Sequence, residues 1–361
     1  MANRERFLEL MGEILERRWF SNDGPVVRDF ESAISRFLGV KHCIATCNAT
    51  VALEIAAKAL GLEAEVIVPS FTFVATAHAL QWLGITPVFC DVDPGTHNID
   101  PAAVERLITS RSTGILGVHL WGTPCEIEVL QEIADRHELA LFFDAAHAFG
   151  CTYAGEYVGR FGRCEIFSFH ATKFLHSFEG GAITTDDDEL AENARRMRNF
   201  GFEGYDNVVS AGINGKMSEP CAAMGLTNLE CIEGLVESNR QSYRAYCAGL
   251  EGIPGIRVVK YDERETCNFQ FVVLELDSEA FGMSRDELVD RLQRCGVLAR
   301  KYFWPGVHRM EAYRSRLSEA SLSLSNTEWL AERVVTLPAG TAVDKDEISG
   351  ICSLIRGSAR D

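Results

Sequence analysis

Between residues 42 and 143 the sequence alternates short apolar runs with segments of helical periodicity. The runs do not alternate apolar with polar residues, so both faces of each strand are expected to be buried. Strands of this kind, each followed by a helix, are typical of a mostly parallel sheet that helices cover on both faces. The apolar runs are His42–Thr46, Glu65–Val68, Pro87–Val92, Gly114–Leu120 and Leu139–Phe143, and the helical segments are Thr50–Ala59, Val74–Leu83, Ala102–Ile108 and Ile127–Arg136.

The pattern changes near residue 250, where regular alternation of strands and helices ends. A further strand is expected at Cys267–Leu276. We therefore predict a large α/β domain over residues 20–250, ending in a long helix at 219–250, and a smaller α+β domain over residues 251–361. The amphipathic segment at residues 3–18 is predicted to be a helix that packs on the smaller domain.

Composition excludes several classes of protein. The formal net charge of −17 argues against a nucleic-acid partner, because phosphate backbones are bound through an excess of Lys and Arg. No apolar run is long enough to span a membrane, and the first residues do not resemble a secretion signal. The 12 cysteines contain no CxxC pair, which favours reduced core cysteines over a zinc site. We expect a cytoplasmic protein without a metal site.

The segment Phe167–Ile183 contains one lysine, Lys173, in a polar loop between two short apolar strands. Because Lys173 is followed by Phe174 and Leu175, desolvation is expected to disfavour its charged form and lower its pKa. An unprotonated lysine can add to an aldehyde and form a Schiff base. The alternative is an exposed loop lysine beside a glycine turn, and this segment alone does not decide between the two.

Asp144 follows the apolar strand Leu139–Phe143, where a buried carboxylate requires a cationic partner. A protonated pyridine nitrogen would be such a partner, and the carboxylate would keep that nitrogen protonated. His147 stands where it could donate a hydrogen bond to a ring hydroxyl. A metal site at Asp144 and His147, or a helix cap, is the alternative, but a metal ion needs more ligands than this segment offers.

Other residues at the carboxyl ends of strands suit a phosphorylated aromatic ligand, since ligands bind at this edge of a parallel sheet. Ala49 and Thr50 begin a helix whose first amides can bind a phosphate, although an ordinary helix cap is a commoner use of such a turn. Phe73 could stack on a flat ring or belong to the core, and Ser168 could donate to a phosphate. With the lysine and the aspartate, these are the groups that pyridoxal phosphate requires.

The sequence resembles the DegT/DnrJ-type sugar aminotransferases, which are pyridoxal-phosphate enzymes of the aspartate-aminotransferase fold (fold type I). The resemblance covers nearly the whole chain and is carried by Asn22–Pro25, Asn48–Thr50, Pro69–Phe73, Asp144–His147, Ser168–Lys173, Glu179–Gly181, Gly212–Glu219 and Leu337–Pro338. It implies that Lys173 carries the cofactor as a Schiff base and that Asp144 faces the pyridine nitrogen.

By the same resemblance, Ala49, Thr50 and Ser168 hold the cofactor phosphate, and Phe73 stacks on the ring. Asn214 is expected to reach the phosphate of the cofactor in a second subunit. This implies an obligate homodimer with shared active sites.

The sequence departs from the family pattern at several positions. His147 stands where many relatives have Gln, and both side chains can hydrogen-bond a ring hydroxyl. Ala49 replaces a frequent Gly, and Lys216 replaces a usual Arg, which puts any bidentate contact there in doubt. Lys173 groups the chain with the transaminating members, because a branch of similar sequence has His at that position and dehydrates sugars.

The resemblance also implies a substrate class. Family members aminate nucleotide-linked keto-deoxysugars, with L-glutamate as donor and pyridoxamine phosphate as the intermediate form of the cofactor. The segments Val118–Gly122 and Lys301–His308 look most like members that aminate carbon 4 of dTDP-4-keto-6-deoxy-D-glucose. Tyr302, Trp304 and His308 are the expected substrate contacts, although aromatic clusters more often serve packing.

Other functions stay open at this point. A 3-keto sugar aminotransferase is the alternative within the class. A catalytically silent sensor or interaction protein with the same fold is an alternative from another class, but it would not need to keep both Lys173 and Asp144. A nicotinamide oxidoreductase is disfavoured because the sequence has no GxGxxG motif after its first strand.

Overall fold

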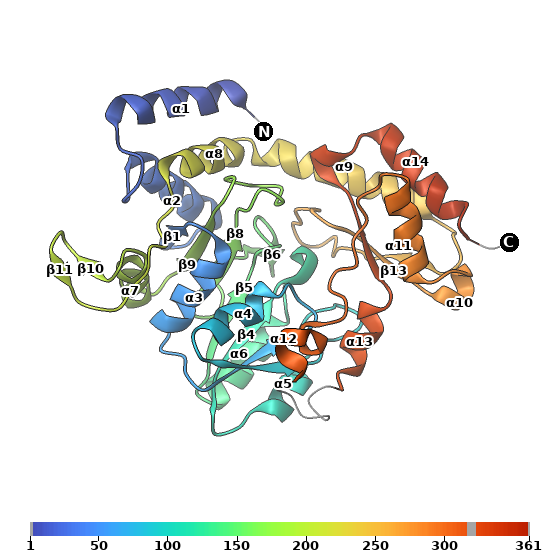
Figure 1. Ribbon diagram of the computed structural model, residues 1–361, viewed down its shortest axis with the longest axis horizontal. Helices are drawn as coiled ribbons and strands as arrows, with labels where there is room; N and C mark the ends of the chain where they lie inside the picture. The colour runs from blue at the N-terminus through green and yellow to red at the C-terminus, as the bar shows by residue number, and fades with distance from the viewer. Residues whose placement is uncertain (1–2, 316–322, 360–361) are drawn as a thin grey trace.

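The structure, a computed structural model, describes residues 3–315 and 323–359, and its centre is a seven-stranded sheet (Figure 1). The strand order is β1-β9-β8-β5-β4-β2-β3, with every neighbouring pair parallel except the two pairs that β9 makes with β1 and β8. The strands are β1 (His42–Thr46), β2 (Glu65–Pro69), β3 (Thr86–Cys90), β4 (Ser112–Val118), β5 (Ala140–Asp144), β8 (Glu165–Ser168) and β9 (Gly181–Thr185). The predicted α/β fold with a mostly parallel sheet is confirmed.

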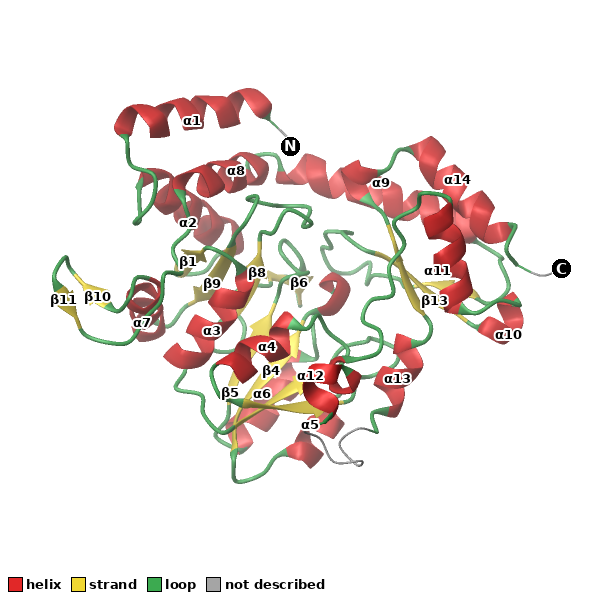
Figure 2. Ribbon diagram, viewed as in Figure 1, coloured by secondary structure: helices red, strands yellow, loops and turns green. Residues whose placement is uncertain are grey.

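Alternate residues of the central strands enter two different hydrophobic cores, which explains why the strand sequences are apolar throughout. In β5, Phe142 lies in one core, whereas Leu141 and Phe143 lie in the other. Helices cover both faces of the sheet (Figure 2). One face carries α3 (Ala49–Ala59), α4 (Ala75–Trp82) and α7 (Asp188–Arg198), and the other carries α2 (Pro25–Leu38), α5 (Pro101–Leu107), α6 (Ile127–Arg136) and α8 (Glu219–Leu229).

The smaller domain is built on an antiparallel sheet of three strands. Tyr246 and Leu250, at the end of α9 (Ile232–Leu250), lie in its core, so α9 joins the two domains. The helix expected at residues 219–250 is therefore two helices, α8 and α9, separated at Glu230 and Cys231. The elements that follow α9 are β12 (Ile256–Val258), β13 (Val272–Leu276), α10 (Ser278–Phe281), α11 (Arg285–Arg294), η2 (Val307–Arg309), α12 (Glu311–Arg314), α13 (Ser325–Ala331), β14 (Val334–Leu337), η4 (Gly340–Ala342) and α14 (Lys345–Arg356). Val307 of η2 and Tyr313 of α12 lie in a core of the large domain.

The N-terminal helix α1 (Arg4–Arg17) packs on the large domain, so its predicted place on the smaller domain is wrong. Leu10 and Ile14 are buried in the core that α2 and α8 share, and Figure 1 shows α1 lying along α8. The apolar stripe of α1 predicted a buried face but carried no information about which surface would cover it.

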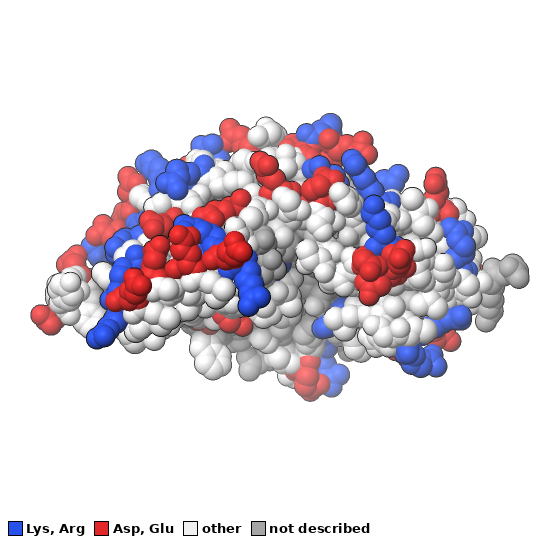
Figure 3. Space-filling view, turned by 90° about the horizontal axis from the view of Figure 1, so that it is seen from above, with Lys and Arg blue, Asp and Glu red and all other residues white. Residues whose placement is uncertain are grey.

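The exposed residues of α1 include several charged side chains and also Leu8 and Leu15. Arg6 pairs with Glu9, and Arg17 lies within 3.7 Å of Glu13. On the face of the molecule shown in Figure 3, acidic and basic side chains are interspersed. Among residues 3–315 and 323–359, no helix has both the length and the hydropathy that a membrane span needs.

The remaining elements are short. They are η1 (Leu120–Gly122), the paired strands β6 (Thr152–Tyr153) and β7 (Glu156–Tyr157), and the hairpin of β10 (Phe202–Glu203) and β11 (Asn207–Val208). The hairpin projects from the body of the large domain (Figure 1).

Candidate active site

Lys173 lies in the loop between β8 and β9, and backbone hydrogen bonds hold that loop closed. The Phe169 amide donates to the Gly180 carbonyl and the Ser177 amide to the Phe169 carbonyl, each at 2.8 Å. The Lys173 side chain is largely surrounded by protein, and burial lowers the pKa of its amine from 10.5 to about 8, while the charge of Asp144 acts in the opposite direction. An appreciable fraction of this amine is therefore unprotonated near neutral pH.

Asp144 is the last residue of β5 and is buried. Its Oδ1 accepts a hydrogen bond from the Ala146 amide at 3.1 Å, and its Oδ2 accepts one from the Thr76 hydroxyl at 2.9 Å. Burial raises the pKa of this carboxyl group, whereas the two hydrogen bonds and the charge of Lys173 lower it. The carboxylate is thus fixed in position but lacks full compensation of its charge, which a protonated ring nitrogen would provide.

His147 is buried in the turn that follows β5. Its Nδ1 accepts a hydrogen bond from the Trp121 amide at 3.3 Å, so the proton of the neutral ring lies on Nε2. Burial lowers the pKa of the imidazole, and the charge of Lys173 lowers it further. The ring packs against Phe271, with a centroid distance of 4.3 Å. A neutral imidazole that presents Nε2–H suits the predicted hydrogen bond to a ring hydroxyl.

The first turn of α3 has the geometry expected of a phosphate site. Asn48 caps the helix, its Oδ1 accepting from the Val51 amide at 2.9 Å, and Ala49 and Thr50 follow as partly exposed residues. The first amides of a helix have no partner within the helix. Gly181 begins β9 directly against this turn, since a Cβ at Gly181 would lie 2.6 Å from the Ala49 nitrogen. Ser168, at the end of β8, is partly exposed.

Phe73 stands just before α4 and is 55% exposed, so its ring is free to cover a ligand. It borders a cleft of about 320 Å³ between the two domains. Arg300, Lys301, Tyr302 and Trp304 also line this cleft. Two of the predicted substrate residues, Tyr302 and Trp304, are therefore brought together beside Phe73.

The third predicted substrate residue, His308, has no exposed surface. Its Nδ1 accepts a hydrogen bond from the Ser70 hydroxyl at 2.7 Å, and its Nε2 lies 3.2 Å from a carboxylate oxygen of Glu328. Both ring nitrogens are engaged, so the predicted direct contact between His308 and the substrate does not fit this arrangement. The residue instead fixes the segment that leads from β2 to Phe73.

Asn214 follows Lys173 by 41 positions in the sequence, and its side chain is exposed. It forms an isolated backbone bridge with Asn199, beside the projecting β10–β11 hairpin. The neighbouring Lys216 places its ammonium 4.5 Å from the centre of the Phe200 ring, and desolvation lowers the pKa of this lysine.

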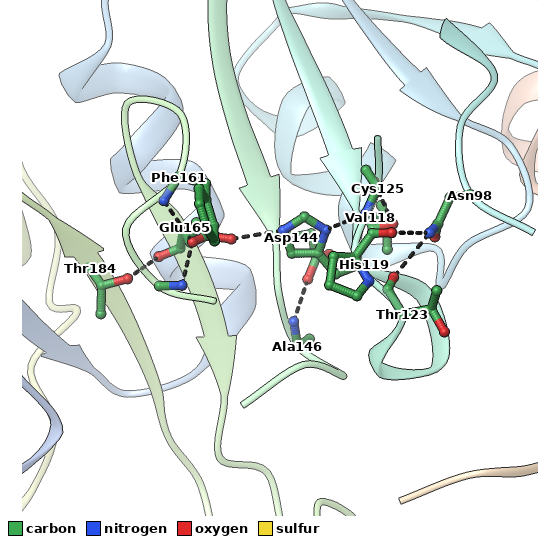
Figure 4. Close-up of polar contacts among 12 residues, drawn as sticks. Asn98, Val118, His119, Thr123, Cys125, Asp144, Ala146, Phe161, Glu165 and Thr184 are labelled. Carbon is green, nitrogen blue, oxygen red and sulfur yellow. Dashed lines mark hydrogen bonds and ion pairs between the residues drawn. The ribbon is translucent and has the colours of Figure 1, made fainter. Parts of the chain in front are cut away.

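Sequence reasoning missed Thr76 and His119. Thr76 lies in the first turn of α4, and its partner Asp144 is 68 positions away, so no local pattern could join them. His119 follows β4, and its amide donates to the Asp144 carbonyl at 3.0 Å (Figure 4). Thr76 lies three residues after Phe73, a spacing that would place both residues on one side of a helix. This spacing is a signal that could have drawn attention to Thr76. In the part of the chain that the structure describes, no group of three or more His, Cys, Asp or Glu side chains is placed to hold a metal ion.

Comparisons with known proteins identify relatives over nearly the whole chain. The sequence pattern of the DegT/DnrJ/EryC1/StrS aminotransferase family matches residues 2–356. A dTDP-4-amino-4,6-dideoxy-D-glucose transaminase of Escherichia coli is 36% identical over 354 residues, which are 97% of this chain and 95% of that protein. A GDP-perosamine synthase of Caulobacter vibrioides is 37% identical over 306 residues, which are 83% of this chain and 82% of that protein.

A solved structure with a similar fold is described as DesI in the presence of its TDP-sugar product. It superimposes with a TM-score of 0.94 at 45% sequence identity. The match covers 99% of this chain and 90% of DesI.

Proposed function

Because this chain belongs to the DegT/DnrJ/EryC1/StrS aminotransferase family, we propose that it transfers the amino group of L-glutamate to carbon 4 of dTDP-4-keto-6-deoxy-D-glucose. The chain is a sugar aminotransferase that uses pyridoxal phosphate, as expected from the sequence. The observation that supports the proposed site best is that Lys173, an amine of lowered pKa, lies close enough to the buried carboxylate of Asp144 for each charge to act on the pKa of the other.

The residues of the site fit pyridoxal phosphate. When bound, the cofactor supplies an aldehyde that condenses with amines and a pyridine ring that accepts electrons. Asp144 would hold the proton on the ring nitrogen, because its own buried charge is incompletely compensated. His147 would donate from Nε2 to the ring hydroxyl, and Phe73 would cover the ring. The phosphate ligands that we propose are Ala49, Thr50 and Ser168.

Lys173 would act at one atom, Nζ. Its unprotonated amine would serve as the nucleophile toward the aldehyde that the cofactor supplies. When it is not bonded to the cofactor, the same amine would accept the α-proton of the amino donor. A pKa of about 8 suits both roles, because part of the amine is unprotonated near neutral pH and the group remains basic enough to accept a proton.

The cleft beside Phe73 supports a nucleotide-linked substrate. Arg300 and Lys301 bring positive charge to a cavity that also has the aromatic surfaces of Tyr302 and Trp304. A sugar nucleotide carries a negatively charged pyrophosphate and a flat base, which suit cations and aromatic rings respectively. The choice of carbon 4 and of dTDP rests on the names of the Escherichia coli relative and of the DesI complex.

We propose further that the active unit is a homodimer with shared sites. The β10–β11 hairpin and the segment after it expose apolar side chains, with Tyr205 96%, Val208 58% and Ile213 40% exposed. Exposed apolar groups that gather in this way mark a surface for protein association. Asn214 lies next to this surface, which supports its predicted contact with the cofactor phosphate of a second subunit.

The proposed location is the cytoplasm. All 12 cysteines are free, and Cys43, Cys90 and Cys125 are among those buried in the core. Proteins of oxidising compartments commonly pair their cysteines, so this usage favours a reducing compartment.

The function is tested by separating its two half-reactions. Holoenzyme mixed with L-glutamate should release one equivalent of 2-oxoglutarate per bound cofactor. The pyridoxamine form that results is then offered dTDP-4-keto-6-deoxy-D-glucose, its 3-keto isomer and a GDP-linked 4-keto sugar. We expect the first sugar to react fastest and to give an amine at carbon 4, as identified by NMR. Faster reaction of the 3-keto isomer would overturn the proposed regiochemistry, and failure of every sugar would overturn the proposed acceptor. Only the absence of 2-oxoglutarate release in the first half-reaction would favour a non-catalytic role.

A further inference from the structure

Two threonine hydroxyls form a chain that ends on Asp144. The Thr76 hydroxyl lies 2.9 Å from Asp144 Oδ2, and the Thr72 hydroxyl lies 3.0 Å from that of Thr76. Thr76 has no exposed surface, and Thr72 is 1% exposed. Buried hydroxyls without a partner are destabilising, so the chain satisfies both groups and delivers one donor to the carboxylate.

The donor and the acceptor of each hydrogen bond between these hydroxyls follow from the chemistry of the carboxylate. An ionised carboxylate can only accept, so the Thr76 hydroxyl must donate to Asp144. The Thr76 oxygen is then free to accept from the Thr72 hydroxyl. Because the Ala146 amide donates to Oδ1, each carboxylate oxygen of Asp144 receives one hydrogen bond from the protein. Each oxygen keeps a further acceptor site, and one of these is available to a ring N–H.

The segment that carries both threonines is held by Val307 and His308, which come from the C-terminal part of the chain. The Ser70 carbonyl accepts from the Val307 amide at 2.9 Å, and the Ser70 hydroxyl accepts from the His308 amide at 3.0 Å. These bonds fix the backbone just before Thr72. The Thr76 hydroxyl therefore approaches Asp144 from a rigid position on the first turn of α4.

We propose that Thr76, supported by Thr72, is a positioning residue that keeps Asp144 ionised and aimed at the ring nitrogen of the cofactor. This inference rests on the proposed role of Asp144. A hydrogen bond to the charged form of a group favours that form, and here it opposes the effect of burial. The charged or titratable groups that act on Asp144 are Lys173 and His119, and the neutral His147 lies in the turn that follows.

The test compares variants that differ at the hydroxyl groups. Thr76→Val removes the donor and keeps the shape, Thr76→Ser keeps the donor, and Thr72→Val removes the second hydroxyl. Each holoenzyme is loaded with cofactor labelled isotopically at the ring nitrogen, and the NMR shift of that nitrogen is followed against pH. The dissociation constant of the cofactor is measured on each apoenzyme.

We expect Thr76→Val to lower the pH at which the ring nitrogen loses its proton and to weaken cofactor binding about tenfold to a hundredfold, as for loss of a hydrogen bond to a charged group. Thr76→Ser should restore both values, and Thr72→Val should shift them less in the same direction. A ring-nitrogen titration in Thr76→Val that matches the wild type would overturn the inference. If Thr76→Val does not fold, the ring-nitrogen titration of Thr72→Val decides. An unchanged titration midpoint in that variant would also overturn the inference.

The Asp144→Asn variant distinguishes failure of the proposed role of Thr76 from failure of the proposed role of Asp144. If Asp144→Asn shifts the ring-nitrogen titration and Thr76→Val does not, the role of Thr76 is wrong while that of Asp144 stands. If Asp144→Asn has no effect either, the proposed site itself is wrong.

Discussion

His119 and Glu165 form a fully buried pair beneath the active site, with 2.8 Å between His119 Nε2 and Glu165 Oε1 (Figure 4). His119 Nδ1 accepts from the Cys125 amide at 3.0 Å, so its proton lies on Nε2 and is donated to Glu165. The other oxygen of Glu165 accepts from the amides of Gly159 and Phe161. The pair thus joins the end of β4 to the start of β8, on either side of the strand that carries Asp144.

Removal of the Glu165 carboxylate is expected to destabilise the protein strongly. Glu165→Ala would leave the His119 ring and two backbone amides buried without an acceptor. Each buried donor that loses its partner costs about 1–3 kcal/mol, so the free energy of unfolding should fall by several kcal/mol. Urea unfolding of the apoenzyme measures this loss, and Glu165→Gln, which keeps one acceptor oxygen, should lose less. Equal stability of Glu165→Ala and wild type would show that the pair does not hold the strands.

Replacement of Lys173 separates cofactor binding from turnover. Lys173→Ala should reduce transamination by at least about 10³-fold, because nucleophile and base are lost together. Some cofactor should remain bound through the proposed phosphate and ring contacts, and it should dissociate on gel filtration faster than from wild type. Lys173→Arg is the matched control, since it restores a cation that cannot act as a base. Substantial activity in either variant would remove Lys173 from the mechanism.

The lowered pKa of Lys173 predicts how capture of the cofactor depends on pH. Only the unprotonated amine adds to the aldehyde, so the capture rate of the apoenzyme should rise about tenfold per pH unit below the pKa and then level off. With a pKa of about 8, the plateau should begin near that pH. Stopped-flow absorbance measures the rate. A rate that keeps rising toward pH 10.5 would mean that burial does not perturb the amine.

The buried carboxylate of Asp144 is expected to lower the stability of the apoenzyme at neutral pH while it supports transamination. Its pKa is raised in the folded apoenzyme, so its contribution to stability is present below the unfolded value of 3.8 and is lost as the pH rises through the folded value. Asp144→Asn should therefore make the apoenzyme more stable than wild type at neutral pH, and the gain should vanish in acid. The same variant should lower transamination about 10²- to 10³-fold, because it removes a charge placed beside the reacting ring. A less stable apoenzyme at neutral pH would contradict the raised pKa.

The sequence was sufficient to predict a mostly parallel sheet but not the order and direction of the strands near β1. Apolar runs such as Leu139–Phe143 predict strands buried on both faces, and the fold follows from their regular alternation with helices. The place of β9 between β1 and β8 did not follow, because hydrophobicity alone does not select a strand's neighbour or its direction. The position of α1 failed for a similar reason, since an apolar stripe does not specify the surface that covers it.

The candidate site was predictable where chemistry is local and not where it depends on contacts. Lys173, which is followed by Phe174 and Leu175, and Asp144, which stands at the end of an apolar strand, are both ionisable residues in apolar surroundings, and the sequence alone reveals this. Thr76 and His119 are not revealed in this way, because a threonine or histidine becomes informative only when its distant partner is known. His308 shows the reverse error, since its motif suggested a ligand contact and its partners prove to be Ser70 and Glu328.

The proposed sharing of active sites predicts complementation between a Lys173 variant and an Asn214 variant. Lys173→Ala keeps Asn214, and Asn214→Ala keeps Lys173, so a mixed dimer would contain one complete site if Asn214 acts across the interface. Loss of the Asn214 contact should weaken cofactor binding about tenfold to a hundredfold, so the assay is run at limiting cofactor.

Differently tagged subunits are co-expressed and the mixed dimer is isolated by two affinity steps. We expect about half of the wild-type activity per dimer, because one of the two proposed sites is then complete. If Asn214 served its own subunit, neither site would be complete, and the mixed dimer would reach only about half of the activity of the Asn214→Ala homodimer. The two arrangements thus differ by the full effect of Asn214, because the same mutations are either combined in one site or separated between two.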